Sequence, residues 1–252
     1  MARAYARSFA GLTAGGTPTL LAGLPSGARL LDVGCGTGAL VRAARDSGAD
    51  AVAVEIDPDM AAFASSDLGT DVTVAGLPDL PFADDGFDAV VLSFVLNHVD
   101  DPRAGARELV RVAAPGGSVR AMIWSSAPTA HGALFREVME ASGAVEPVVP
   151  RLPEHLDFER SVDGLGQLFV AAGAPVVEAG MVDWTWRVGP DDWWAGVTGG
   201  VGNSGVAWAA QTPEVQARMR EELDRLAAPL LEDGAMVFPA SAAYVEARVP
   251  RS

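Results

Sequence analysis

Three glycines stand at alternate positions in the run Leu31-Asp32-Val33-Gly34-Cys35-Gly36-Thr37-Gly38, between an apolar segment and a helix-like one. Glycines at such a turn let the backbone approach a ligand and leave the N–H groups of the helix free to bind it. The run continues into Ala39 and so also satisfies the dinucleotide pattern G-x-G-x-x-G/A, and Glu55 has about the spacing of a ribose-binding acid. The glycines therefore indicate a nucleotide-type cofactor without deciding which one.

Asp32 bears on that choice because it precedes the first glycine by two residues. A carboxylate there would sit badly beside a pyrophosphate but well near a ligand that carries a sulfonium and an ammonium group. The alternative is a buried residue that bonds the loop backbone, which suits either cofactor. Asp32 therefore favours a sulfonium ligand without settling the matter.

Strand-like and helix-like segments alternate along the first half of the chain. Five strands alternating with four helices predict a parallel, doubly wound sheet. The strand over 87–94 is apolar nearly throughout, as expected of a strand that is covered on both faces. The strands are expected over 28–33, 51–56, 71–75, 87–94 and 118–124, and helices over 39–46, from Pro58 with Asp57 as cap, and over 103–113 with Asp101-Pro102 as cap.

The second half has a different rhythm, with a Pro-rich, irregular stretch over 147–153. An amphipathic helix that begins at Thr212-Pro213 carries Val215, Met219, Leu223, Leu226 and Leu230 on one face. We predict one domain over 1–252, an α/β Rossmann-like fold with a seven-stranded, mostly parallel sheet and helices on both faces. Its core covers about 28–124, and a small helical cap is inserted over about 189–235. Further helices are expected over 131–142 and 161–172, and strands over 176–188 and 242–249.

Five segments resemble the motifs of class I S-adenosylmethionine (SAM)-dependent methyltransferases, in the right order. The similarity is greatest to the small-molecule branch that includes the ubiquinone and menaquinone biosynthesis methyltransferases, and it covers about residues 28–124. The segments are Leu31 to Gly38, Val54-Glu55-Ile56-Asp57-Pro58-Asp59-Met60, Leu80-Pro81-Phe82-Ala83-Asp84-Asp85-Gly86-Phe87-Asp88, Asn97-His98-Val99-Asp100-Asp101-Pro102, and Leu109 to Gly117.

The resemblance implies SAM as cofactor and S-adenosylhomocysteine (SAH) as product. It also implies a role for each matching position. Gly34, Cys35 and Gly36 line the methionine portion, Asp32 lies near its amino group, Glu55 holds the ribose hydroxyls, Ile56 and Met60 sandwich the adenine, the Leu77 N–H meets the adenine edge, and the Ser93 carbonyl faces the ammonium group.

One cofactor-binding position departs from the family pattern. The family often carries a Gly-Asp pair before L-P-F, and that Asp receives the adenine amino group. Here Gly76 stands in its place, within Ala75-Gly76-Leu77-Pro78-Asp79. The amino group must then bond something else, such as Asp79 or water.

His98 is the candidate catalytic residue, because it follows the fourth strand at the edge where such sheets bind ligands. It could remove a proton from an acceptor hydroxyl or orient it, or it could be a structural histidine. Methyl transfer can also proceed without a base, since a sulfonium is a strong electrophile and alignment supplies much of the rate. His131 and His155 are expected at the surface or in caps.

Aromatic residues outside the motifs have two interpretations each. Tyr5 and Phe9 form either a lid over the cofactor or an apolar anchor. Trp184 and Trp186 fit a core strand, whereas Trp193 and Trp194, at the start of the cap, could line an apolar or aromatic acceptor pocket.

Composition excludes several classes of protein. The net charge of −15 over 252 residues, from 18 Lys+Arg against 33 Asp+Glu, disfavours nucleic acid as substrate. The single cysteine, Cys35, excludes an intrachain disulfide and is not expected to be a nucleophile. The pairs Asp84-Asp85 and Asp100-Asp101 fit turns and caps, so no metal site is expected. No signal peptide or membrane insertion is expected, so the prediction is a cytoplasmic protein of open oligomeric state.

The predicted reaction moves a methyl group from SAM to an O, N or C atom of a small, apolar or aromatic acceptor. Three alternatives stay open. They are a SAM-binding enzyme that catalyses a cyclisation or rearrangement, an NAD(P)-dependent oxidoreductase, and a SAM-binding regulator without catalysis.

Overall fold

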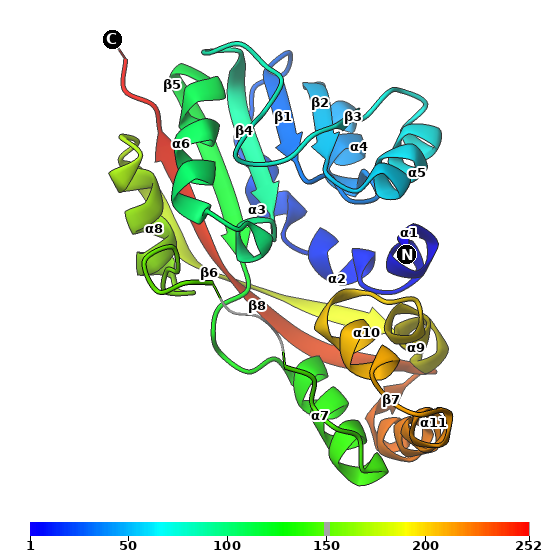
Figure 1. Ribbon diagram of the computed structural model, residues 1–252. Helices are drawn as coiled ribbons and strands as arrows, with labels where there is room; N and C mark the ends of the chain where they lie inside the picture. Colours follow the sequence, from blue (N-terminus) through cyan, green and yellow to red (C-terminus); the bar gives the residue numbers. More distant parts are fainter. Residues whose placement is uncertain (149–151, 252) are drawn as a thin grey trace. The chain divides into compact units, whose positions relative to one another are not determined.

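The computed structural model describes residues 1–148 and 152–251 (Figure 1). Part of the Pro-rich stretch over 147–153 therefore lies outside the described residues. The chain forms two compact units. The glycine-loop unit comprises the described residues of Gly16–Ser126, Leu152–Val182 and Ser241–Ser252. The helical unit comprises those of Met1–Gly15, Ala127–Arg151 and Asp183–Ala240.

The sheet confirms the expected α/β class and has the order β3-β2-β1-β4-β5-β8-β6. The first five strands of this order pair in parallel, and β8 runs antiparallel to β5. The strands are β1 Arg29–Val33, β2 Asp50–Glu55, β3 Thr73–Val74, β4 Phe87–Ser93, β5 Ala113–Ile123, β6 Val176–Val188 and β8 Ala235–Arg248.

The expected count of seven strands is wrong, because the sheet formed by residues 1–148 and 152–251 has eight. The additional strand is β7, Leu231–Glu232, which pairs antiparallel with the start of β8. The two residues between them, Asp233 and Gly234, have φ values of 51° and 80°. Asp-Gly is a strong signal for a two-residue hairpin turn, so the sequence contained this feature.

Helices of the glycine-loop unit begin where the caps predict. Asp57 Oδ1 accepts a hydrogen bond from the Met60 N–H at 2.9 Å, and Asp101 Oδ1 accepts one from the Ala104 N–H at 2.8 Å. Both predicted N-caps are confirmed. The helices are α3 Thr17–Leu21, α4 Ala39–Asp46, α5 Pro58–Leu68, the 3₁₀ turn η1 Leu96–His98, α6 Pro102–Val112 and α8 Val162–Ala171.

The expected alternation of five strands with four helices is wrong at one connection. Between β3 and β4 the chain forms no helix, only turns and an isolated bridge between Gly76 and Asp79. Pro78 and Pro81 lie within this short segment and lack the N–H that a helix interior needs. The open segment leaves the Gly76 region beside the end of β2.

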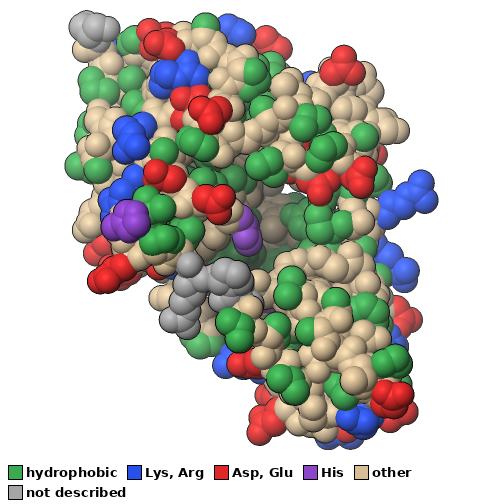
Figure 2. Space-filling model, in the orientation of Figure 1, with side chains coloured by type: hydrophobic (Ala, Val, Ile, Leu, Met, Phe, Trp, Pro, Cys, Tyr) green, Lys and Arg blue, Asp and Glu red, His purple; other side chains and the backbone are tan. Residues whose placement is uncertain are grey.

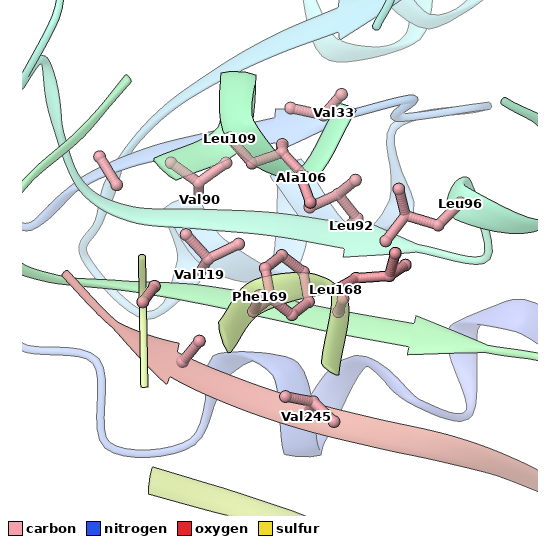
Figure 3. Close-up of a cluster of buried hydrophobic side chains, with 14 of the residues drawn as sticks. Val33, Val90, Leu92, Leu96, Ala106, Leu109, Val119, Leu168, Phe169 and Val245 are labelled. Atoms are coloured by element: carbon pink, nitrogen blue, oxygen red, sulfur yellow. The ribbon is translucent and has the colours of Figure 1, made fainter. Parts of the chain in front are cut away.

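Helices α6 and α8 cover one face of the sheet (Figure 3). Leu109 of α6 and Leu168 and Phe169 of α8 belong to one buried cluster with Val90 of β4 and Val119 of β5. Val90, Val91 and Leu92 are all fully buried, so β4 is covered on both faces as its sequence predicts. This packing fixes the ends of β1 and β4, where the candidate site lies.

The helical unit contains the helices of the expected insertion. Its last long helix ends at Ala227 and is followed by the 3₁₀ turn η2 Ala228–Leu230. Leu230, expected on the apolar face, is exposed instead, because Pro229 does not continue the helix. The helices are α1 Ala2–Arg7, α2 Ala10–Ala14, α7 Ala130–Ser142, α9 Pro190–Thr198, α10 Gly202–Ala209 and α11 Pro213–Ala227.

Acidic and basic side chains alternate over the surface without separating into large areas of one charge on the face that is shown (Figure 2). Across the described part of the chain, every helix is too short or too polar to cross a membrane.

Candidate cofactor site

The glycine loop follows β1 directly and requires glycine for two reasons. Gly34 and Gly36 have φ values of 74° and 55°, which L-residues with a side chain rarely adopt. A Cβ atom on Gly34 would lie 2.5 Å from Cγ2 of Val95, the second residue after β4. The glycine loop and the loop after β4 therefore lie in direct contact.

Asp32 lies on β1 within this loop's motif and is 1% exposed. Neither of its carboxylate oxygens has a hydrogen-bond partner among the described residues, so it does not bond the loop backbone as the alternative interpretation requires. Burial, and then the nearby charge of Glu55, raise the pKa of Asp32 to about 7. Such a carboxylate favours a ligand with positive charge and disfavours a pyrophosphate.

Glu55 ends β2 and connects two loops. Its Oε2 accepts a hydrogen bond from the Gly36 N–H at 2.9 Å, and its Oε1 accepts from the N–H groups of Ile56 and Asp57 at 2.9 and 3.1 Å. These bonds hold the glycine loop against the end of β2. The implied contact with ribose hydroxyls stays a prediction.

Cys35 lies between the two glycines and is buried. Burial raises the pKa of its thiol, with further contributions from the charges of Asp32 and Glu55. The thiol therefore stays protonated at neutral pH, which agrees with the expectation that Cys35 is not a nucleophile.

Ile56 and Gly76 explain the departure from the family pattern. Ile56 is 69% exposed, unusual for an apolar side chain, whereas Met60 is buried. A Cβ atom on Gly76 would lie 2.8 Å from Cδ1 of Ile56, so an aspartate at this position would force Ile56 aside. The next residue, Leu77, faces α6, where a Cβ on Gly105 would lie 3.3 Å from its Cδ1.

A second group of residues lies where β4 and β5 end. Ser93 is the last residue of β4, and Phe94 after it has a φ of 62°, a left-handed conformation that costs about 1–2 kcal/mol for a residue with a Cβ. The Phe94 ring stacks on Trp124, with ring centroids 4.0 Å apart and planes at 18°. Asn97 Nδ2 donates a hydrogen bond to the Trp124 carbonyl oxygen at 3.1 Å.

His98 ends the 3₁₀ turn η1 beside these residues. Its surface is exposed, yet enough protein surrounds the imidazole that desolvation lowers its pKa below the ordinary 6.5. His98 is therefore neutral at pH 7 and able to accept a proton. Its catalytic role stays a prediction.

Sequence reasoning did not select Phe94, Asn97 or Trp124 as site residues. Asn97 stands inside a quoted motif, so its position was visible. The left-handed backbone of Phe94 has no local signal, because the apolar strand pattern simply continues through it. The stacking of Phe94 on Trp124 joins residues that are distant in the chain.

The remaining aromatic candidates belong to the helical unit. The Tyr5 hydroxyl hydrogen-bonds the Thr13 hydroxyl at 2.8 Å. Trp193 is buried, with its ring centroid 6.1 Å from that of Phe135, and Trp194 is half-buried. Their roles as lid and acceptor pocket stay predictions.

His131 is not at the surface, one of its two expected places, but it lies in the first turn of α7, 3.4 Å (Nε2) from the hydroxyl of the N-cap Thr129. It is half-buried, with its ring 5.6 Å from that of Trp186, and burial lowers its pKa to about 4. His155 is exposed, as expected.

Comparison with known proteins shows a similarity to methyltransferases over part of the chain. Residues 31–121 match the family model of a methyltransferase domain. Demethylmenaquinone methyltransferase from Clavibacter sepedonicus is 41% identical over 107 residues, which cover 41% of this chain and 44% of that protein. The enzyme of the same name from Corynebacterium urealyticum is 38% identical over 134 residues, covering 52% of this chain and 57% of that protein. The chain thus matches about half the length of these curated relatives.

Solved structures share the fold over most of the chain. A protein from Bacillus halodurans C-125, solved as a candidate methyltransferase, has a TM-score of 0.59 at 18% identity and covers 93% of this chain and 98% of its own. The [4+2]-cyclase SpnF has a TM-score of 0.56 at 20% identity and covers 94% and 80%. These similarities confirm the fold, and with the matched motif they confirm the resemblance to class I SAM-dependent methyltransferases related to the quinone biosynthesis enzymes.

Proposed function

We propose that this protein binds SAM at the glycine loop and transfers its methyl group to an O, N or C atom of a small, apolar or aromatic acceptor. The observation that carries the proposal is Asp32, a buried carboxylate without a partner among the described residues, beside a loop whose backbone conformation favours glycine. A ligand with an ammonium and a sulfonium group compensates that charge, whereas a dinucleotide adds to it.

The residues of the loop fit such a ligand. Gly34, Cys35 and Gly36 would face the methionine portion, and Glu55 would accept from the ribose hydroxyls while its bonds to Gly36 and Ile56 hold it in place. Ile56 presents its exposed side chain to the adenine. Met60, Leu77 and Ser93 keep the roles that the resemblance implies. When bound, SAM supplies a methyl group on a sulfonium, which is an electrophile.

The acceptor side is the end of β4 and β5, where Phe94 and Trp124 offer an aromatic surface. The named relatives act on demethylmenaquinone, which supports an apolar, ring-containing acceptor. His98, neutral at pH 7, would orient the acceptor or accept its proton. The acidity of the chain supports a metabolite acceptor over nucleic acid, and we keep the cytoplasm as the predicted location.

Isothermal titration of the purified protein tests the cofactor. We expect SAM and SAH to bind, and NAD and NADPH not to bind at the same concentrations. Asp32→Asn should weaken SAM by about tenfold, the order of one charge-assisted interaction. Binding of NADPH without binding of SAH would overturn the proposal.

An assay of SAH release tests the reaction, with demethylmenaquinone as first acceptor and a panel of hydroxylated aromatic compounds after it. Stoichiometric SAH with a methylated product is expected. The similarity of fold to a [4+2]-cyclase gives the alternative a concrete form. In that case SAM binds, the second substrate is cyclised or rearranged without being methylated, and no SAH is released.

A further inference from the structure

Asn97 is held in one orientation at the end of the methyltransferase core. Its Nδ2 donates to the Trp124 carbonyl oxygen at 3.1 Å. Because a carbonyl oxygen only accepts, the amide N–H₂ must face Trp124 and the amide oxygen must face elsewhere. The side chain is thus fixed with its acceptor atom pointing away from β5.

That acceptor atom, Asn97 Oδ1, is shielded from solvent and has no donor among residues 1–148 and 152–251. A shielded acceptor without a donor destabilises a protein, and such groups in native structures are few. The main chain next to it is also strained, at the left-handed Phe94. Two local costs at one place are typical of a functional site and not of a surface that only packs.

The surroundings of Asn97 are aromatic and close to the cofactor loop. Phe94 and Trp124 stack at 4.0 Å, and Trp124 is half-buried, so part of the pair faces outward. Val95, between Phe94 and Asn97 in the chain, abuts Gly34 of the glycine loop. An acceptor lying against the aromatic pair would therefore be next to the proposed SAM site.

We propose that Asn97 determines acceptor specificity: its Oδ1 accepts a hydrogen bond from a hydroxyl or N–H group of a planar aromatic acceptor whose ring lies against Phe94 and Trp124. This inference rests on the proposed function, because it assigns the acceptor side of the same site. An acceptor that lacks the donor leaves Oδ1 unsatisfied, and the site discriminates against it.

Reaching Oδ1 requires a local side-chain movement, since solvent does not touch it in this structure. His98, the next residue, is exposed, and Trp124 is half-buried, so such a movement would take place at the surface and not within the core. The acceptor therefore binds by local adjustment, and its donor group completes the hydrogen bonding of Asn97.

The test compares two probes on the SAH-saturated protein by titration calorimetry: 1-naphthol, which has a hydroxyl donor, and 1-methoxynaphthalene, which has the same rings without it. We expect the wild type to favour 1-naphthol by about five- to tenfold, the size of one net hydrogen bond. Asn97→Leu, which keeps approximately the volume of the side chain, should bring the ratio close to one. Trp124→Leu should weaken both probes and leave the ratio unchanged.

Asn203→Ala serves as the matched control, because Asn203 is the other asparagine of the chain and lies exposed on α10. It should keep the wild-type ratio. SAH affinity within twofold of wild type shows that Asn97→Leu has folded with its cofactor site intact, and Asn97→Ala is the second variant should Asn97→Leu fail this check.

The two proposals fail in different ways. If the wild type does not bind SAH, the proposed function fails. If SAH binds but the wild type shows no preference for 1-naphthol, or the preference survives in both Asn97 variants, the assignment of Asn97 is wrong and the proposed function is untouched.

Discussion

Two groups of aromatic side chains, one in each unit, differ in how deeply they are buried and in the backbone conformation beside them. In the helical unit, Trp186 is 3% exposed and has the rings of Phe9, His131 and Phe238 within 5.6 to 5.7 Å of its own. These are favourable aromatic distances, and burial keeps the imidazole neutral.

In the glycine-loop unit, Phe94 and Trp124 stack beside an unsatisfied amide oxygen and on a left-handed backbone. The sequence would not separate these two groups, because both are aromatic residues near a histidine. The cluster around Trp186 therefore packs as part of a core, whereas the end of β4 combines two locally unfavourable features, which supports the proposal of a ligand site there.

Trp186→Ala should give the largest effect on stability, a loss of about 3–5 kcal/mol in the free energy of unfolding, because a buried indole leaves a cavity. Urea unfolding followed by circular dichroism measures it. SAH affinity of the folded protein, at a temperature well below the transition, should stay within twofold. A loss of SAH affinity at unchanged stability would contradict the division between the two groups.

Gly34→Ala should reduce SAH affinity by at least tenfold, because the added Cβ meets Val95 at 2.5 Å and the residue must keep a φ of 74°. Calorimetry measures the affinity. Gly180→Ala on β6 is the matched control, since its Cβ meets nothing within 4 Å. Equal affinities of the two variants would show that the glycine loop does not form the cofactor site.

Asp32→Asn should raise the stability of the folded protein and lower its affinity for SAM, and both effects should be larger at pH 8 than at pH 5. The pKa of Asp32 is raised from 3.8 to about 7 in the folded protein, so the folded state keeps a proton that the unfolded chain loses. The stability that this proton provides is complete below pH 4 and is lost as pH rises to 7. In urea unfolding, Asp32→Asn should therefore have a higher midpoint concentration than the wild type at pH 8, and the difference should be smaller at pH 5.

The pH dependence of SAM affinity is a second test of the charge of Asp32. In the wild type it should rise between pH 6 and pH 8, by up to about tenfold, as Asp32 ionises. In Asp32→Asn this part of the pH dependence should vanish. A wild-type affinity that falls over this range would place the positive charge of the ligand away from Asp32.

His98→Gln should give the smallest effect on stability, within about 0.5 kcal/mol, because the residue is exposed. Steady-state kinetics with an acceptor that the wild type methylates should show kcat reduced by about tenfold or more at constant KM, since a neutral imidazole would be lost as proton acceptor. The wild-type rate should be flat above pH 7, because the pKa of His98 lies below 6.5. An unchanged kcat would remove His98 from the chemistry.

The amino-acid sequence was enough to predict the local features of the candidate cofactor site. The glycine loop, Asp32, Glu55 and the caps Asp57 and Asp101 are local features, so a few neighbouring residues suffice to specify them. The same local logic was present in Asp233-Gly234 and predicts β7 in hindsight.

The proposed acceptor side and the contact of Gly76 with Ile56 became visible only in the folded chain. The Ile56 side chain occupies the space that a side chain at Gly76 would need. Asn97 acquires a fixed direction because β5 brings the Trp124 carbonyl beside it. These relations join residues 20 to 30 positions apart, and the sheet pairing that creates them is a non-local property that no short pattern encodes.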